Sequence, residues 1–270
     1  AGNSGSTILS MLLGAHSEIV SVGELSQLDR YISLDKECSC GLPVSKCDFW
    51  SEVLHEEWSP APVKPLCNSV KLLTRGGAAI IADKSYNHII NRNLNIYKRI
   101  LQLTNSSVVI DSSKDLVRLY YLFRSGQFRI LPLYMTRDGR AYIYSMKKRL
   151  SMSPLRSTTR WARMNQETIM ILKKLRAWND TIHMEYNSFT NNPEESIRKI
   201  CTAMNLEYDD QVFDFYTRRH HNIAGTNKRF SPERISPQNR WKEDLSSMDT
   251  AIFKMLGGNI LNKRYGVLSE

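Results

Sequence analysis

The fold class follows most directly from residues 108–123, which read Val108-Val-Ile-Asp-Ser-Ser-Lys-Asp-Leu-Val-Arg-Leu-Tyr-Tyr-Leu-Phe123. The run Val108-Val-Ile-Asp111 is rich in β-branched residues and is typical of a buried strand. A polar turn, Ser112-Ser-Lys114, follows it, and the apolar spacing from Leu116 to Phe123 predicts a helix. Strand, polar turn and helix in this order are the unit from which parallel sheets covered by helices are built.

The same order recurs on both sides of this stretch. Further strands are predicted at Ile19–Val22, Ala78–Ala82, Arg129–Met135 and Thr181–Glu185, and helices at Ile8–Leu13, Asn91–Leu103, from Gly139, over Thr159–Trp178 and from Asn192. Asn192 suits a helix N-cap, Pro193 the first turn and Glu195 the capping-box position. The sequence therefore predicts an α/β fold with a mostly parallel central sheet flanked by helices.

Chemically informative residues stand at four predicted strand ends. They are the small-residue turn Ser4–Thr7, the carboxylate of Glu24, the polar turn Ser112–Lys114 and the guanidinium of Arg137. Parallel sheets bind ligands beyond the carboxyl ends of their strands. We therefore expect an anion-binding loop, a carboxylate, a lysine and an arginine at one edge of the sheet.

Composition and charge narrow the function classes. The chain has 270 residues and a net charge of +10, and its 41% hydrophobic and 24% charged residues exclude a disordered or collagenous chain. No apolar run approaches the roughly 18 residues of a membrane helix. Lys114–Arg176 holds fifteen Lys and Arg against three Asp and Glu, a local charge of +12. This basic region indicates a polyanionic ligand, with solvated helix faces as the alternative.

Two segments are candidate phosphate sites. Gly2-Asn-Ser-Gly-Ser-Thr7 precedes a helix, so its backbone N–H groups and hydroxyls suit an anion, although a plain N-cap turn is the alternative. The Gly-Lys-Ser/Thr ending of a Walker A loop is absent, which argues against ATP or GTP hydrolysis. Ser145 and Arg149 are four residues apart and share a helix face, and with Arg137 they could hold a phosphate dianion. A solvated basic helix is the alternative for this second segment.

The five cysteines leave three possibilities open. Cys38, Cys40 and Cys47 are crowded together, whereas Cys67 and Cys201 stand apart. A Cys40–Cys47 disulfide would indicate an oxidising compartment. A zinc site usually shows two paired clusters, which this spacing lacks. Free thiols are the third possibility, so no metal ligand is assigned.

The motifs taken together resemble one family, the sulfotransferases. Ser4-Gly-Ser-Thr7 with Val22-Gly-Glu24 is similar to their 5′-phosphosulfate loop, and the Arg137–Arg149 run is similar to their 3′-phosphate motif. The similarity continues through His183-Met-Glu-Tyr186, Asn192-Pro-Glu-Glu195, Ile200-Cys201, Leu206, Gly225-Thr-Asn227-Lys-Arg229-Phe and Trp241-Lys242. The insert of about residues 36–65, with its Cys-Ser-Cys-Gly…Cys-Asp-Phe-Trp50 sequence, resembles one in bacterial members. The resemblance spans nearly the whole chain in order.

The resemblance implies a three-layer, P-loop-like fold and one domain over residues 1–270, with the family's first strand before Ala1. It implies metal-free, in-line transfer of a sulfuryl group from 3′-phosphoadenosine 5′-phosphosulfate, which leaves 3′-phosphoadenosine 5′-phosphate. Glu24 would be the general base, and Lys114 would stabilise charge on the leaving phosphate oxygen. The implied donor-binding residues are Ser4, Gly5, Ser6, Thr7, Arg137, Ser145, Arg149 and Arg229. His220 and His221 are weaker candidates for the base.

The resemblance leaves the acceptor and the compartment open. A carbohydrate hydroxyl is the first choice of acceptor, followed by a tyrosine or a small natural product. Family members usually carry Arg, Lys or His where this chain has Asn3, so a catalytically impaired nucleotide- or polyanion-binding module is the alternative function. A nucleic-acid partner is disfavoured because no recognition motif or interleaved aromatic residues accompany the basic region. The compartment would be the cytoplasm for a bacterial member and the Golgi lumen for a eukaryotic one whose anchor has been removed.

Overall fold

The computed structural model describes residues 5–54, 62–64, 86–230, 235–237 and 239–267. Ser4, Cys67 and the strand predicted at Ala78–Ala82 therefore lie outside the described residues. The chain divides into two compact units. The β1–β2 unit comprises Ser6–Ile130 and Asn205–Arg234, and the β3–β4 unit comprises Ala1–Gly5, Leu131–Met204 and Ile235–Glu270. The single domain over residues 1–270 that the resemblance implies stays a prediction.

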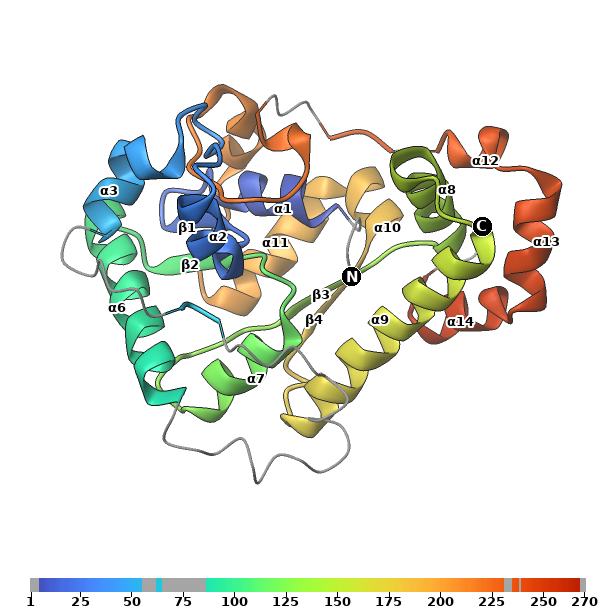
Figure 1. The fold of residues 1–270 in the computed structure, drawn as a ribbon, viewed down its shortest axis with the longest axis horizontal. Helices are drawn as coiled ribbons and strands as arrows, with labels where there is room; N and C mark the ends of the chain where they lie inside the picture. Colours follow the sequence, from blue (N-terminus) through green and yellow to red (C-terminus); the bar gives the residue numbers. More distant parts are fainter. Residues whose placement is uncertain (1–4, 55–61, 65–85, 231–234, 238, 268–270) are drawn as a thin grey trace. The chain divides into compact units, whose positions relative to one another are not determined.

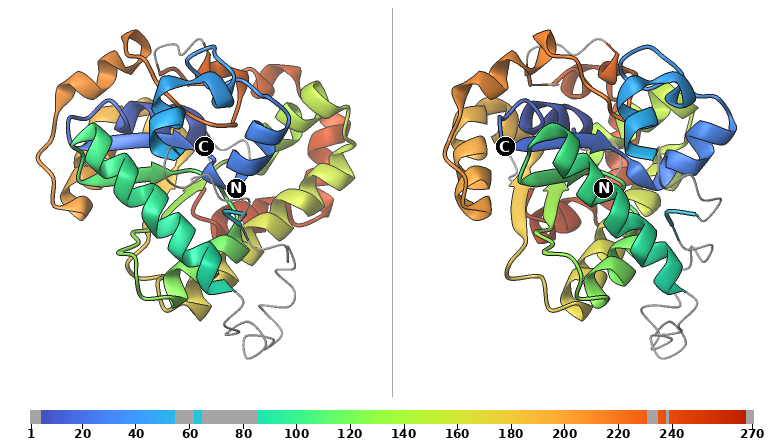
Figure 2. Two further views of the ribbon diagram at one scale, coloured as in Figure 1. Left: turned by 60° about the vertical axis from the view of Figure 1, so that its left-hand side comes forward. Right: turned by 90° about the vertical axis from the view of Figure 1, so that its left-hand side faces the viewer.

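The β1–β2 unit is built on two parallel strands, β1 (Ile19–Gly23) and β2 (Val108–Asp111), with Ile19 opposite Val108. The pair runs side by side in Figure 1 and Figure 2. The helices of this unit are α1 (Ser6–Leu13), η1 (Leu25–Gln27), α2 (Leu28–Ser33), η2 (Val44–Lys46), α3 (Asp48–Leu54), α6 (Asn87–Thr104), α7 (Leu116–Arg124), η4 (Asp210–Thr217) and η5 (Asn227–Arg229). The parallel pairing aligns the carboxyl ends of the two strands at one edge.

Apolar residues of β1 and its following helices form the core of this unit. Val22, Leu25 and Leu28 are fully buried together with Trp50 of α3 and Ile96 of α6. The helical spacing that predicted a helix over Asn91–Leu103 thus marks the face of α6 that packs on this core. Burial of this face keeps the end of β1 in place, which matters because Glu24 follows it directly.

The β3–β4 unit is built on a second parallel pair, β3 (Leu133–Thr136) and β4 (Ile182–Glu185), with Leu133 opposite Ile182. Its helices are α8 (Gly139–Leu150), α9 (Pro154–Lys174), α10 (Tyr186–Asn191), α11 (Pro193–Met204), α12 (Trp241–Asp244), α13 (Ser247–Met255) and α14 (Gly258–Arg264). α8 and α9 pack against each other. A core that includes Tyr142, Trp161 and Phe253 anchors α8 in this unit.

Most predicted elements are confirmed with shifted boundaries, and two of the shifts have a local chemical cause. β3 begins at Leu133 instead of Arg129, because Pro132 has no N–H to donate, although its carbonyl accepts a hydrogen bond from Ile182 N. α9 begins at Pro154 instead of Thr159, because Ser153 caps it and proline suits the first helical turn. The α/β class with parallel strands is confirmed, and within the described residues the strands form two parallel pairs.

No helix in the described part of the chain has both the length and the apolar character required to cross a bilayer.

Candidate active site

Glu24 and Lys114 meet beyond the carboxyl ends of β1 and β2. Ser112 N donates to Gly23 O at 2.7 Å, which ties the two strand ends together. Lys114 Nζ then forms an ion pair with Glu24 Oε1 at 2.5 Å, and the two side chains are 27% and 21% exposed. The sequence-based prediction that these two residues share one edge of the sheet is confirmed. A carboxylate and an ammonium group are thereby held together where solvent can reach both.

The backbone on either side holds both residues in position. Glu24 N donates to Ile223 O at 2.7 Å, and Gly23 forms an isolated β-bridge with Ile223. Gly23 itself has a φ of 72°. A Cβ at Gly23 would collide with the Ile223 carbonyl oxygen, so the close approach requires glycine. Lys114 has a φ of 55°, and the next residue, Asp115, caps α7 by accepting from Val117 N and Arg118 N. These two fixed turns present Glu24 and Lys114 to each other.

Asp111, at the end of β2, has a structural role. Its Oδ1 accepts from Ser113 N at 2.9 Å, and its Oδ2 pairs with Arg118 at 2.7 Å and accepts from Tyr97 OH at 2.6 Å. Burial alone would raise the pKa of this carboxyl, but Arg118 and these donors outweigh burial and lower the pKa. Asp111 thus holds the turn that follows β2 through its bonds to Ser113 and Arg118. Glu24 is therefore the carboxylate available at this edge.

The turn at the start of α1 is described from Gly5 onward. Gly5 belongs to the β3–β4 unit, and Ser6 and Thr7 begin α1 in the β1–β2 unit. Thr226 N donates to Thr7 Oγ1 at 3.4 Å, so the segment before η5 approaches the first turn of α1. A helix start of this kind has backbone N–H groups that suit an anion.

Arg229 lies in η5, which packs on α1 within the same unit. Its guanidinium carbon is 4.0 Å from the centroid of the Phe230 ring, and its side chain is largely buried. Arg229 Nε is buried and has no hydrogen-bond partner among the described residues. A buried guanidinium nitrogen that lacks a partner is costly unless a ligand satisfies it. Arg229 therefore keeps its place among the donor-binding candidates.

Tyr186 connects Gly5 with Arg137 inside the β3–β4 unit. The Arg137 guanidinium stacks on the Tyr186 ring, 4.4 Å from its centroid. Burial lowers the pKa of Arg137 and raises the pKa of the Tyr186 hydroxyl. A Cβ at Gly5 would lie 2.5 Å from the same ring, and Gly5 has a φ of 89°. The sequence-based assignment missed Tyr186 as a site residue, although it ends the His183–Tyr186 motif.

Ser145 and Arg149 lie one turn apart on α8, as the sequence predicts. Ser145 is half-buried and Arg149 is exposed. Asp138 caps this helix by accepting from Arg140 N at 2.7 Å. The joint binding of one phosphate by Arg137, Ser145 and Arg149 stays a prediction.

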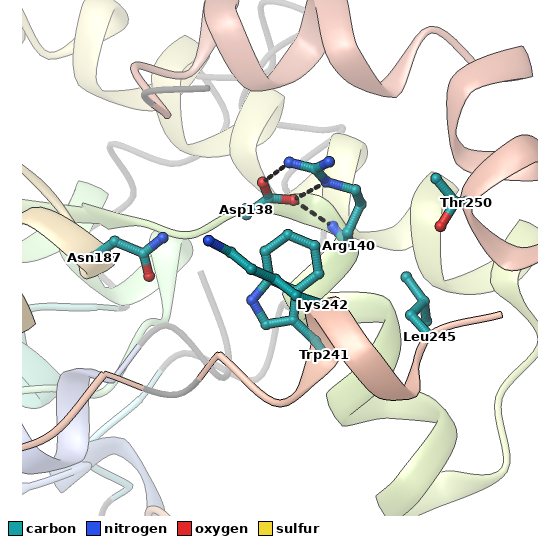
Figure 3. A pocket seen from close by; sticks show the side chains of 7 residues that line it. All are labelled: Asp138, Arg140, Asn187, Trp241, Lys242, Leu245 and Thr250. Carbon is teal, nitrogen blue, oxygen red and sulfur yellow. Dashed lines mark hydrogen bonds and ion pairs between the residues drawn. The ribbon is translucent and has the colours of Figure 1, made fainter. Parts of the chain in front are cut away.

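A pocket of about 410 Å³ lies beside the start of α8 in the β3–β4 unit, and it is lined by Asp138, Arg140, Asn187, Trp241, Lys242, Leu245 and Thr250. Asp138 holds the Arg140 guanidinium through an ion pair of 2.7 Å. That guanidinium lies 4.7 Å from the centroid of the Trp241 ring. Figure 3 shows the Lys242 side chain extending toward the Asn187 amide. The buried Trp241 Nε1 has no partner among the described residues. The pocket lining thus combines the Trp241 indole, whose N–H has no described partner, with the cationic side chains of Arg140 and Lys242.

The contact between Gly5 and Tyr186 gives a direct test of this site. Replacing Gly5 by alanine should lower the free energy of unfolding by about 1–3 kcal/mol, because the added methyl group overlaps a buried ring. Thermal or urea-induced unfolding measures this change. Gly266→Ala is the matched control, since Gly266 has a φ of 72° and no described atom within 4 Å of a new Cβ. Equal destabilisation by the two variants would show that the Tyr186 contact is absent.

Comparisons with known proteins identify the fold. Neither a protein-family model nor a curated protein sequence matches the chain. The chain is similar to a solved sulfotransferase domain of a Synechococcus olefin synthase, with a TM-score of 0.55 and 16% identity over 95% of this chain and 92% of that one. It is also similar to a sulfotransferase domain of the curacin biosynthetic pathway, with a TM-score of 0.54 and 19% identity over 94% of each chain.

Proposed function

We propose that this chain, which has the α/β fold of the sulfotransferases, transfers a sulfuryl group from 3′-phosphoadenosine 5′-phosphosulfate to an acceptor hydroxyl. The observation that carries the proposal is the Glu24–Lys114 pair beyond the carboxyl ends of two parallel strands. A general base and a cation side by side are the two groups that such a transfer requires of the protein.

We assign the two phosphate groups of this nucleotide to two separate sets of residues. We assign the 5′-phosphosulfate to the segment Ser4, Gly5, Ser6 and Thr7, where α1 begins. Arg229 offers a buried Nε without a described partner. We assign the 3′-phosphate to Arg137, Ser145 and Arg149. The pocket beside α8 adds the Trp241 indole and the Lys242 ammonium, which suit a base and a ribose phosphate.

The bound donor supplies an activated sulfuryl group. The chain's own residues accept the proton of the acceptor and stabilise the charge on the leaving group. Glu24 accepts the proton of the acceptor hydroxyl as that oxygen bonds to sulfur. Lys114 stabilises the negative charge that develops on the phosphate oxygen as its bond to sulfur breaks. Lys114 donates one N–H to Glu24, and an ammonium group has three N–H groups to donate. The same lysine can therefore orient the base and face the leaving group.

A carbohydrate hydroxyl is the acceptor that we propose first. The similar solved domains come from an olefin synthase and from the curacin biosynthetic pathway, so a small natural product is the second candidate. Tyrosine is the third. A screen of these three acceptor classes with the sulfuryl donor, read by mass spectrometry for one added sulfuryl group, distinguishes them. Donor binding without transfer to any acceptor class would favour a binding module that has lost catalysis. This is the leading alternative, because Asn3 is uncharged where family members usually carry a basic residue.

The donor assignment predicts a specific nucleotide preference. 3′-Phosphoadenosine 5′-phosphate should raise the melting temperature, and AMP, which lacks the 3′-phosphate, should do so far less. A hydrogen bond to a charged group contributes about 1.5–3 kcal/mol, so affinity should differ by about tenfold or more. Thermal shift and calorimetry measure the two affinities.

Arg137→Met should remove most of this preference, since the variant keeps the length of the side chain and loses its charge. Arg264→Met is the matched control, because Arg264 is exposed at the end of α14 in the same unit. Equal stabilisation of the wild-type chain by the two nucleotides would rule out a 3′-phosphate site.

A further inference from the structure

Four potential metal ligands converge in the β1–β2 unit, apart from the residues assigned to sulfuryl transfer. The ligand atoms of Cys38, Cys40, Cys47 and His221 all lie within 4.8 Å of one another. Cys40 Sγ is 3.6 Å from Cys47 Sγ, and Cys47 Sγ is 3.2 Å from His221 Nδ1. Tetrahedral zinc, with bonds of about 2.3 Å to sulfur and 2.0 Å to nitrogen, places its ligand atoms about 3.5–3.8 Å apart. The Cys40–Cys47 and Cys47–His221 separations are close to these values, and the others stay within 4.8 Å.

A disulfide accounts for this cluster less well. Bonded sulfur atoms are about 2.05 Å apart, well below the Cys40–Cys47 separation, and Cys38, Cys40 and Cys47 are all unbridged. A single Cys40–Cys47 bond would also involve only two of the four groups and would not explain why Cys38 and His221 lie beside them. A metal ion would be coordinated by all four.

Backbone hydrogen bonds hold the cysteine loop in shape. Cys38 N donates to Leu42 O at 2.8 Å, and Gly41 N donates to Cys38 O at 3.0 Å. Gly41 has a φ of 88°, which allows the chain to turn back on itself between Cys40 and Cys47. Cys38 and Cys47 are fully buried. The three sulfur atoms are therefore held on one side of a closed loop.

His221 reaches this loop from a segment 174 residues after Cys47. Ser39 Oγ donates to His220 O at 2.7 Å, and Asn222 N donates to Ser39 Oγ at 2.8 Å. Trp50 Nε1 donates to His221 O at 2.9 Å, and the Phe49 ring stacks on the imidazole at 5.0 Å. These contacts fix the backbone and the ring on both sides of the ligand nitrogen, as supporting residues do in metal sites.

We propose that Cys38, Cys40, Cys47 and His221 bind one structural zinc ion. Three sulfur ligands and one nitrogen ligand complete a tetrahedral shell with no open position, so the ion has no catalytic coordination site. Soft thiolates with one imidazole favour zinc over magnesium, calcium or manganese. This inference goes beyond the proposed sulfuryl transfer and does not depend on it.

The ion would link the cysteine loop to the segment His221–Ile223, which forms hydrogen bonds with the backbone of Val22 and Glu24. Asn222 and Ile223 follow His221 directly, and Ile223 N donates to Val22 O at 3.0 Å while Ile223 O accepts from Glu24 N. Zinc would thus connect residues 38–47 to the end of β1 through three consecutive residues. Loss of the metal should loosen this connection and lower the melting temperature.

The metal content of the purified chain tests the proposal. The chain is expressed with zinc in the medium and purified under reducing conditions without chelator, and elemental analysis should find about one zinc ion per chain. Cys40→Ser, Cys47→Ser and His221→Gln should each reduce the content to near zero. Cys201→Ser is the matched control, because Cys201 is a buried cysteine on α11 outside the cluster. Cys67→Ser should also keep the metal.

A second measurement covers variants that fail to fold. Replacement of zinc by cobalt in the wild-type chain should produce sulfur-to-cobalt charge-transfer bands and the intense visible bands of a tetrahedral ion. The proposal would be overturned if the purified wild-type chain contained no metal. It would also be overturned if that chain had a Cys40–Cys47 disulfide, or if an alkylating reagent modified its cluster thiols rapidly. Iron in place of zinc would overturn the choice of metal. Loss of zinc in Cys201→Ser or Cys67→Ser, or its retention in His221→Gln, would overturn the ligand set.

Discussion

Replacement of Glu24 by glutamine is expected to lower the turnover number by about 10²–10⁴-fold, the usual contribution of a general base. The variant keeps the shape of the side chain and removes its ability to accept the acceptor's proton. Donor affinity should change little, because Glu24 acts on the acceptor. Steady-state rates with the acceptor found in the screen, together with calorimetric binding of 3′-phosphoadenosine 5′-phosphate, measure the two effects separately.

Glu18→Gln is the matched control for Glu24→Gln. Glu18 is exposed and directly precedes β1, so it stands at the opposite end of the strand from Glu24. This variant should keep wild-type turnover. A Glu24→Gln enzyme that works within a few-fold of the wild type would assign Glu24 a structural role.

Lys114→Met should lower turnover by about 10²–10³-fold, the cost of removing one group that stabilises charge in the transition state. Donor affinity should fall much less, because the charge on the leaving oxygen develops only as the reaction proceeds. Rates and donor affinity are measured as for Glu24. Lys98→Met is the matched control, since Lys98 is exposed on α6 of the same unit.

The Glu24→Gln/Lys114→Met double variant shows whether the two residues act together. Their ion pair makes non-additive losses the expected result, because residues in direct contact share their effects. A variant of Lys114 that only weakened donor binding, with unchanged turnover at saturation, would contradict the role assigned to this lysine.

The pairing of Glu24 with Lys114 could be predicted largely from the sequence. Ile19–Gly23 and Val108–Asp111 are β-branched runs followed by polar turns, and the parallel pairing of such strands aligns the residues that follow them. The roles of Asp111 as a turn acceptor and Asp138 as a helix cap were equally accessible, because both depend on amides within two residues of the carboxyl. These features share one property, which is that short-range patterns specify them.

The contact of Tyr186 with Gly5 and Arg137 could not be read from the sequence in this way. The three residues come from separate parts of the chain, and only packing shows that a Cβ at Gly5 would overlap the ring that carries the Arg137 guanidinium. The same holds for Arg229, whose unsatisfied Nε results from burial beside Phe230 rather than from any local motif.

The sequence by itself determined the α/β class with parallel strands, the strand ends that present Glu24 and Lys114, and the crowding of Cys38, Cys40 and Cys47 in one loop. Hydrophobic periodicity and turn chemistry act over a few residues, so they are legible in the sequence. Only the tertiary structure decided that His221 completes the cysteine cluster. No local pattern connects residues 174 positions apart, and the backbone hydrogen bonds from Ser39 and Trp50 that bring His221 to the loop exist only in the folded chain.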